Sequence, residues 1–264
     1  MILASPGEVI LTIGSLKIYY YGVIMALAVL IGLFACKLVC KKIYEDSDFD
    51  VIYNLSVGTI ICGFLGARLY YVFAAYKYFL YNPWEIFAFR NGGMAIHGAI
   101  IGGLIFAVLY LKYKKLPVLK YLDILSFGLV SGQIIGRWGN FFKSDAFGMP
   151  TFSWLKLYIP VEKRPVEFAA FDYFHPTFLY EILLNIILLL LLCIIARKTK
   201  KFGSGFVLFS YILFYSIIRM FVEYIRIDSV LNLSGIPLAQ YVSLIGILTG
   251  IIGLFILSFK NKIC

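Results

Sequence analysis

Seven long apolar stretches dominate the chain, and short segments that contain most of the charged residues separate them. A transmembrane helix needs about 20 apolar residues to cross a hydrocarbon core of roughly 30 Å. The stretches of that length lie near residues 17–40, 51–75, 94–113, 117–136, 177–196, 205–226 and 237–259. We therefore predict an all-α polytopic membrane protein, with seven transmembrane helices in a single integral membrane domain over residues 1–264.

Composition agrees with this prediction. Hydrophobic residues make up 62% of the 264-residue chain and charged residues 14%, and the mean hydropathy is +0.91. These values exclude an ordinary soluble domain. Residues 1–15 contain no lysine or arginine ahead of the first apolar stretch, so we expect no cleavable signal peptide and a first helix that stays in the mature protein.

The positions of the basic residues predict the orientation in the membrane. Clusters follow the first, third, fifth and seventh stretches: Lys41 and Lys42; Lys112, Lys114, Lys115 and Lys120; Arg197, Lys198, Lys200 and Lys201; Lys260 and Lys262. All of them fall on one side, and basic loops tend to stay in the cytoplasm. We therefore expect the N-terminus outside and the C-terminus in the cytoplasm. Topology accounts for much of the net charge of +10, so we expect no nucleic-acid partner.

Two exterior segments lie between the predicted helices. Residues 76–92 are rich in aromatic side chains, which is typical of an interfacial arm that lies on the lipid bilayer. Residues 149–176 form a 28-residue connection, which is long enough for a small exterior cap or recognition domain.

The stretch from Gly136 to Gly148, GRWGNFFKSDAFG, places polar groups at the end of an apolar run. An arginine at membrane depth costs roughly 2.5 to 3.5 kcal/mol on insertion scales, so it normally faces a protein interior and marks a site. Arg137 is such a residue. The alternative is a helix end whose arginine extends to water. This stretch alone leaves both interpretations open.

The predicted sixth helix carries Tyr215, Arg219, Glu223 and Arg226 at spacings of four, four and three residues. That spacing places them on one narrow stripe. An internal ion pair between Arg219 and Glu223, which would need no substrate, is one interpretation. The other interpretation is a positively charged pocket. Basic residues outnumber acidic ones at the outer level: Arg68, Arg137, Arg219 and Arg226 against Asp145, Glu181 and Glu223. A positive pocket there would attract an anion, and phospholipid headgroups are the anions available in a membrane.

Glycines and cysteines indicate architecture rather than chemistry. Gly128, Gly132 and Gly136 form a stripe on the predicted fourth helix, and Gly98 and Gly102 do so on the third. Such faces let helix backbones approach closely. The five cysteines show no metal-ligand spacing with histidine, so we expect no disulfide, metal or cofactor.

Six motifs in order along the chain carry a resemblance to a known family. They are YYYG at 19–22, GARL at 66–69, GGMAIHG at 92–98, GRWGNF at 136–141, HPTFLYE at 175–181 and YSIIRMFVEYIR at 215–226. In these motifs the chain resembles the phosphatidylglycerol:prolipoprotein diacylglyceryl transferases along nearly its whole length. The resemblance implies seven transmembrane helices and an enzyme of the bacterial cytoplasmic membrane. Its substrates would be phosphatidylglycerol and the signal peptide of a prolipoprotein, whose lipobox cysteine would receive the diacylglyceryl group.

The resemblance also implies site residues. The expected catalytic residues are His97, Arg137, Arg219, Tyr21 and Asn140. The expected substrate-binding residues are Arg137, Arg219, Arg68, Tyr215, Glu223, Asp145, Gly148 and Arg226. The family pattern commonly reads GNFxNxExxG, whereas this chain has Lys143 for the second asparagine and Asp145 for the glutamate. Arginines suit a departing phosphate, and His97 suits the deprotonation of a thiol.

Further roles stay open at this point. Asn140 would fix headgroup or loop geometry, and Tyr21 and Tyr215 would bond glycerol hydroxyls or orient the arginines. His175, which precedes a proline at a helix start, is interpreted as structural or rim-located. The central expectation is that His97, Arg137 and Arg219 share one cavity at the extracytoplasmic level.

The sequence leaves two other function classes open. An anion or lipid transporter or channel would line a path with intramembrane arginines, but polar residues do not continue to the predicted cytoplasmic face, apart from Asp123 and Asn54. A non-catalytic lipid-binding scaffold would need the arginines but not His97.

Overall fold

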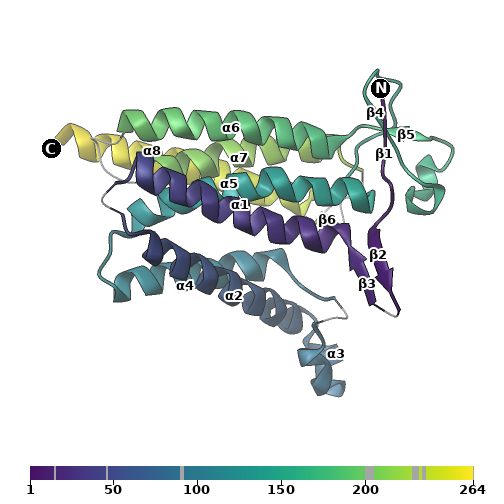
Figure 1. Ribbon diagram of the computed structural model, residues 1–264, viewed down its shortest axis with the longest axis horizontal. Coiled ribbons are helices and arrows are strands. Elements are labelled where there is room, and N and C mark those ends of the chain that lie inside the picture. Colours follow the sequence, from purple (N-terminus) through teal and green to yellow (C-terminus); the bar gives the residue numbers. More distant parts are fainter. Residues whose placement is uncertain are drawn as a thin grey trace. The chain divides into compact units, whose positions relative to one another are not determined.

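The computed structural model describes residues 1–14, 16–45, 47–89, 92–199, 205–227, 232–233 and 236–263 (Figure 1). Within these residues seven helices are long and apolar enough to cross a membrane, which confirms the prediction. They are α1 (Tyr20–Lys42), α2 (Phe49–Ala74), α4 (Ile96–Tyr113), α5 (Val118–Lys143), α6 (Thr177–Thr199), α7 (Phe206–Ile225) and α8 (Leu238–Ile263). The predicted orientation of the termini stays a prediction.

The chain divides into two compact units. The larger unit comprises Met1–Glu45 and Leu122–Cys264, and the smaller unit comprises Asp46–Tyr121. The larger unit contains α1, nearly all of α5, and α6, α7 and α8, while the smaller unit contains α2 and α4. That all these helices belong to a single membrane domain stays a prediction.

In the larger unit, α1 and α5 pack through the predicted glycine stripe. A Cβ atom added to Gly32 would lie 2.8 Å from the carbonyl oxygen of Gly128, and one added to Gly132 would lie 3.4 Å from that of Ala28. The two backbones therefore approach as closely as small residues allow. This packing supports the part of α5 that carries Arg137.

Asp123 fixes the start of α7. Its carboxylate accepts hydrogen bonds from the backbone N–H groups of Gly205, at 2.6 Å, and Leu208, at 2.7 Å. The first N–H groups of a helix have no acceptor within the helix, and a carboxylate also complements the helix dipole. Asp123 is buried, so this exception to the polar pattern is accounted for as a helix cap supplied by α5.

At one end of the larger unit, short strands build a small sheet that the sequence did not predict (Figure 1). Strand β1 (Ile2–Ala4) pairs in parallel with β4 (Lys156–Tyr158), and β4 pairs antiparallel with β5 (Tyr173–Phe174). The N-terminus thus joins the predicted exterior segment, where the short 3-10 turns η3 (Val161–Lys163) and η4 (Val166–Phe168) also lie. The buried residues beneath are Phe147, Leu157, Ile159, Phe174, Phe178 and Ile182.

Two further pairs of strands are equally short. Strands β2 (Val9–Ile13) and β3 (Leu16–Tyr19) form an antiparallel hairpin directly before α1, and β6 (Asn232–Leu233) pairs with β7 (Ile236–Pro237) before α8. The described part of the chain is therefore mainly helical, as predicted, and its short strands lie before α1 and in the connections between later helices.

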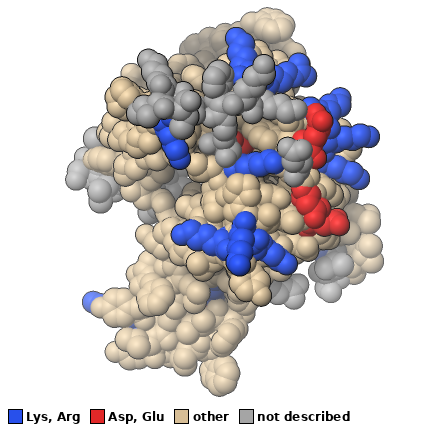
Figure 2. Space-filling model, turned by 90° about the vertical axis from the view of Figure 1, so that its left-hand side faces the viewer, with Lys and Arg blue, Asp and Glu red and all other residues tan. Residues whose placement is uncertain are grey.

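At the other end of the larger unit, α1 and α6 finish with basic residues. Lys41 and Lys42 lie in the last turn of α1, and Arg197 and Lys198 in that of α6. Lysine and arginine side chains gather on the face that Figure 2 shows. This is the distribution on which the predicted cytoplasmic side depends.

In the smaller unit, α2 and α4 pack on glycines. A Cβ atom added to Gly66 would lie 2.4 Å from the carbonyl oxygen of Gly98, and one added to Gly102 would lie 2.6 Å from that of Cys62. Between the two helices, α3 (Tyr76–Tyr81) and the 3-10 turn η1 (Pro83–Phe87) form the segment predicted to be an arm. Its aromatic residues Tyr78, Tyr81, Trp84 and Phe87 are exposed.

Candidate functional site

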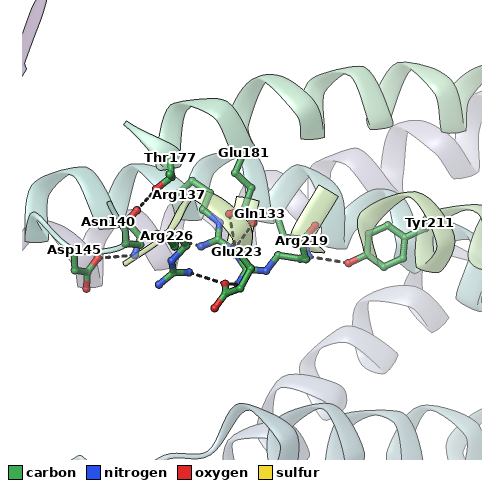
Figure 3. A network of polar contacts seen from close by, with 11 residues as sticks. Gln133, Arg137, Asn140, Asp145, Thr177, Glu181, Tyr211, Arg219, Glu223 and Arg226 are labelled. Carbon is green, nitrogen blue, oxygen red and sulfur yellow. Dashed lines mark hydrogen bonds and ion pairs between the residues drawn. The ribbon is translucent and has the colours of Figure 1, made fainter. Parts of the chain in front are cut away.

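A chain of ion pairs joins α5, α6 and α7 in the larger unit (Figure 3). Glu181 of α6 pairs with Arg137 of α5 and with Arg219 of α7, the latter at 3.1 Å between Oε2 and Nη1. Glu223 Oε2 lies 2.8 Å from Arg219 Nη2 and 3.8 Å from Arg226 Nη1. Three arginines and two glutamates therefore alternate in one network, which we call the Arg–Glu network.

Burial differs between the acids and the bases of this network. The side chains of Glu181 and Glu223 are 2% and 4% exposed, whereas those of Arg137, Arg219 and Arg226 are 20%, 16% and 15% exposed. The net formal charge of the five residues is +1. Buried carboxylates that anchor partly exposed guanidinium groups form a rigid positive surface, which suits an anion with several oxygen atoms.

Of the two interpretations of the α7 stripe, the internal ion pair is observed and the anion-binding pocket stays a prediction. The Arg219–Glu223 ion pair is present, and the network still carries an excess of positive charge. Arg68, the fourth arginine of the count, lies in the smaller unit, so its part in a positive pocket stays a prediction. For Arg137, the cross-helix pair with Glu181 favours a site over a side chain that merely extends to water.

The end of α5 extends the network through an amide. Asn140 accepts a hydrogen bond from Arg137 Nη1 at 3.5 Å and donates one from Nδ2 to Asp145 Oδ1 at 2.6 Å. Asp145 also pairs with Lys143 at 2.8 Å. The carboxylate of Asp145 therefore reaches Asn140 although its side chain is one methylene shorter than the family's glutamate.

Gly148 lies where three segments meet. Its N–H donates to the carbonyl oxygen of His175 at 3.0 Å, and the next N–H donates to that of Ile225 at the end of α7. A Cβ atom here would lie 2.8 Å from Ile225 Cγ2 and 2.9 Å from His175 Cβ. Only glycine permits this close approach, so Gly148 fixes the ends of the helices that carry the network.

His175 lies beside this junction. Its Nδ1 atom is 3.0 Å from the hydroxyl oxygen of Tyr180, and its backbone groups bond to Gly148 and Met149. These contacts fit the structural role predicted for it.

Tyrosine side chains pack on α5 and α7 near this network. Tyr215 lies beside Arg137 and Arg219, and its ring stacks on that of Tyr211 with centroids 5.6 Å apart. Tyr211 in turn accepts a hydrogen bond from Gln133 at 2.8 Å. The ring of Tyr21 packs on Gly139, where a Cβ atom would lie 2.8 Å from Tyr21 Cδ2.

From the sequence, Glu181 had no catalytic or substrate-binding role and was counted only among the acids at the outer level. It links Arg137 and Arg219 directly. The available signal was its position as a lone acid in the first turns of the apolar helix α6, because an ionisable residue in a membrane helix normally marks a site. Asn185, one turn further along α6, is also fully buried and was not predicted.

His97 and Arg68 belong to the smaller unit. His97 is half-buried in the first turn of α4, with its ring centroid 6.0 Å from that of Tyr70. Arg68 is buried on α2 and donates hydrogen bonds to backbone carbonyl groups between residues 85 and 93. The cavity shared by His97, Arg137 and Arg219, and the role of Arg68 in substrate binding, stay predictions.

Among the residues that the structure describes, no three His, Cys, Asp or Glu side chains are grouped as a metal site would require.

Comparison with known proteins gives concordant matches. A family model described as prolipoprotein diacylglyceryl transferase matches residues 8–256. A protein of Trichormus variabilis is 40% identical over 264 residues, which cover 98% of this chain and 92% of that protein. One of Prochlorococcus marinus strain MIT 9215 is 38% identical, with 97% and 94% covered. One of Synechococcus elongatus is 40% identical, with 95% and 87% covered. All three are named phosphatidylglycerol–prolipoprotein diacylglyceryl transferase.

Proposed function

The chain belongs to the prolipoprotein diacylglyceryl transferase family, and we propose that it transfers the diacylglyceryl group of phosphatidylglycerol to the thiol of a prolipoprotein cysteine. The products are a thioether on the cysteine and glycerol phosphate, and the reaction is the first step of lipoprotein maturation. We further propose that the cysteine lies in the lipobox of a signal peptide. The reaction would take place at the extracytoplasmic side of the bacterial cytoplasmic membrane.

The proposed reaction requires a nucleophile and a stabilised leaving group. The cysteine sulfur attacks the glyceryl carbon C3, and the bond between that carbon and the phosphate oxygen breaks. The bonding electrons stay with the phosphate, which leaves as glycerol phosphate, and the thiol proton passes to a base. Negative charge therefore grows on the phosphate oxygen atoms in the transition state. Fixed cations near that oxygen lower the barrier most effectively when water is scarce.

The Arg–Glu network is the observation that carries this proposal. Its guanidinium groups are partly exposed while the carboxylates that hold them are buried. A planar guanidinium can bind two phosphate oxygen atoms at once. Arg137 and Arg219 share Glu181, so their spacing is set before a substrate arrives. We assign the phosphate to these two arginines, with Arg226 at the rim.

A base is needed because an unperturbed cysteine thiol, with a pKa near 8.5, is mostly protonated at neutral pH. His97 is our candidate, since imidazole accepts a proton in this pH range. Tyr21 and Tyr215 are proposed to bond the lipid's glycerol oxygen atoms or to orient the arginines. Four further residues are proposed to hold the binding surface in place through the contacts described above: Asn140, Asp145, Glu223 and Gly148.

The test uses purified protein in nanodiscs that contain phosphatidylglycerol, together with a lipobox peptide. Transfer is scored by the mass gain of the peptide and by released glycerol phosphate. We expect turnover by the parent protein and near-complete loss in His97→Ala and Arg137→Ala. Arg164→Ala is the matched control, because Arg164 pairs with Asp172 in the exterior segment, and it should keep most of the activity.

The same assay, together with an anion-flux measurement on the protein in sealed vesicles, separates the other two classes. A peptide with serine in place of cysteine should gain no mass, because the hydroxyl is a much weaker nucleophile. If the parent binds phosphatidylglycerol without turnover, the scaffold is favoured. If it moves anions across a sealed vesicle without modifying the peptide, the transporter is favoured. If His97→Ala reacts at the parental rate, histidine is not the base.

A further inference from the structure

The guanidinium of Arg68 is surrounded by backbone carbonyl groups. Nε donates to Ile86 at 3.0 Å, Nη1 donates to Gly92 at 2.6 Å and Gly93 at 3.0 Å, and Nη2 donates to Ala88 at 3.4 Å and to Glu85. These five hydrogen bonds equal the number of N–H groups that a guanidinium has. The donors that a phosphate would need are therefore already engaged.

The surroundings of Arg68 are otherwise aromatic. The guanidinium carbon lies 5.9, 5.5 and 5.7 Å from the ring centroids of Tyr71, Phe79 and Phe89, within the range of cation–π contacts. Within the described part of the chain Arg68 forms no ion pair, and the carboxylate of Glu85 accepts from Tyr78 instead, at 2.7 Å. Carbonyl dipoles and ring faces thus stabilise this buried charge.

The five carbonyl groups come from two different segments. Glu85, Ile86 and Ala88 belong to the exterior arm around η1, whereas Gly92 and Gly93 belong to the turn that leads into α4. Both glycines have positive φ values, +81° and +72°. A Cβ atom on Gly93 would lie 2.7 Å from Arg68 Nη1 and 2.5 Å from Tyr71 Cε1. The glycine turn is therefore shaped to fit the arginine.

His97 follows this turn directly. The N–H of Ala95 donates to the carbonyl oxygen of Ala67 at 3.1 Å, and Gly98 packs on Gly66 and Tyr70. The imidazole thus lies between two anchored positions, and both anchors are on the turn of α2 that carries Arg68. A residue that holds residues 92 and 93 in place also sets where α4 begins and where the first-turn histidine lies.

From this geometry we infer that Arg68 is a positioning residue, which binds the exterior arm and the first turn of α4 into one rigid piece and so orients His97. This role would replace the substrate contact predicted from the sequence. The inference that Arg68 orients His97 for catalysis rests on the proposed function. The inference that Arg68 fixes the arm to α2 does not. A lysine could not take this role, because one ammonium has only three donors and lacks the planar fork.

The experiment compares Arg68→Lys with the parent in nanodiscs by two measurements. The first is amide hydrogen exchange, which reports local opening. We expect exchange in residues 83–89 and 92–100 to rise roughly tenfold or more, because hydrogen bonds to a charged donor are lost, while residues 177–199 stay unchanged. Arg164→Lys is the control, since Arg164 also donates to backbone carbonyl groups, those of Ile159 and Ala169. It should leave exchange in residues 83–100 as in the parent.

The second measurement is transfer kinetics with varied phosphatidylglycerol. Misplacing a catalytic group should lower kcat roughly 10- to 100-fold, with little change in KM for the lipid. Unchanged exchange in residues 83–100 together with a raised KM would overturn the inference and assign Arg68 to the phosphate. Faster exchange throughout the chain would overturn it too, because Arg68 would then support the whole fold. If the parent shows no transfer at all, the proposed function fails, but the exchange data still decide whether Arg68 holds the arm.

Discussion

Replacing Glu181 by glutamine tests whether the arginines act through their positions or only through their charge. Glu181 is 2% exposed and pairs with Arg137 and Arg219. Glutamine has nearly the same shape but no charge, and its NH2 group can only donate. The net formal charge of the Arg–Glu network rises from +1 to +2, and one of the two guanidinium groups meets an NH2 donor in place of a carboxylate oxygen.

The magnitude follows from burial. Breaking a buried ion pair by removing one partner costs about 3 to 5 kcal/mol, because the remaining charge is left uncompensated. Arg219 keeps its pair with Glu223, which places the expected loss of unfolding free energy at the lower end, about 3 kcal/mol. Loosening the two arginines proposed to bind the phosphate should lower kcat roughly 100-fold or more.

The assay measures kcat and the lipid KM for Glu181→Gln, Glu181→Asp and the parent, with thermal unfolding followed in parallel. Aspartate keeps the charge on a shorter side chain, so it should recover part of the activity. Glu162→Gln is the control, because Glu162 is exposed in η3, and it should change neither quantity appreciably. If Glu181→Gln turns over within about threefold of the parent and binds the lipid more tightly, positive potential suffices and the argument from positioning is wrong.

Three further predictions concern residues around the network. Gly148→Ala should lower the unfolding temperature and the activity together, because the new methyl group meets Ile225 at 2.8 Å; an activity equal to the parent's would show that the junction adapts. Asp123→Asn should lower stability by about 1 to 3 kcal/mol by weakening the cap of α7, with KM for the lipid unchanged; a thermal scan and lipid titration check both parts. Asp145→Ala should reduce kcat, since the partner of Asn140 at 2.6 Å is lost, whereas Asp145→Glu, the family's residue, should stay active.

The transmembrane helices were predictable because length and apolarity are local properties of the sequence. The helix that carries the site shows where this prediction ends. The apolar window of the fourth helix was placed at 117–136, but α5 continues to Lys143. An apolar window ends at the first arginine, whereas the helix continues past Arg137, whose charge pairs with Glu181 on another helix. The four residues from Arg137 to Asn140 therefore lie on a helix rather than in a loop.

The strands could not be predicted for a different reason. Strand β1 pairs residues 2–4 with residues 156–158, so its only signal is a contact across most of the chain. Strands of two to five residues are also too short to show an alternating pattern. The connection at residues 149–176 was recognised by its length, but its sheet includes the N-terminal strand β1, which lies far away in the sequence.

Within the site, the part that lies on one helix was predictable. The spacing of Arg219 and Glu223 on α7 offered their ion pair as one of two interpretations, and that pair is present. Contacts between helices were not predictable. Glu181 is the example, because its partners Arg137 and Arg219 lie on two other helices. Counting charges also could not distinguish Arg68, which is enclosed by carbonyl groups, from Arg137, which is partly exposed. Residue type gives the charge, but only packing determines which donors can meet a ligand.

The two glutamates in the network have a further consequence for the proposed reaction. Phosphatidylglycerol carries a phosphodiester with one negative charge, and the departing glycerol phosphate carries up to two, because a phosphate monoester has a second pKa near 6. Three arginines without carboxylates would therefore bind the product more strongly than the substrate. Glu181 and Glu223 reduce the net charge of the network to +1 while they fix the guanidinium groups in place. The same carboxylates thus favour a defined geometry in the transition state and release of the product afterwards.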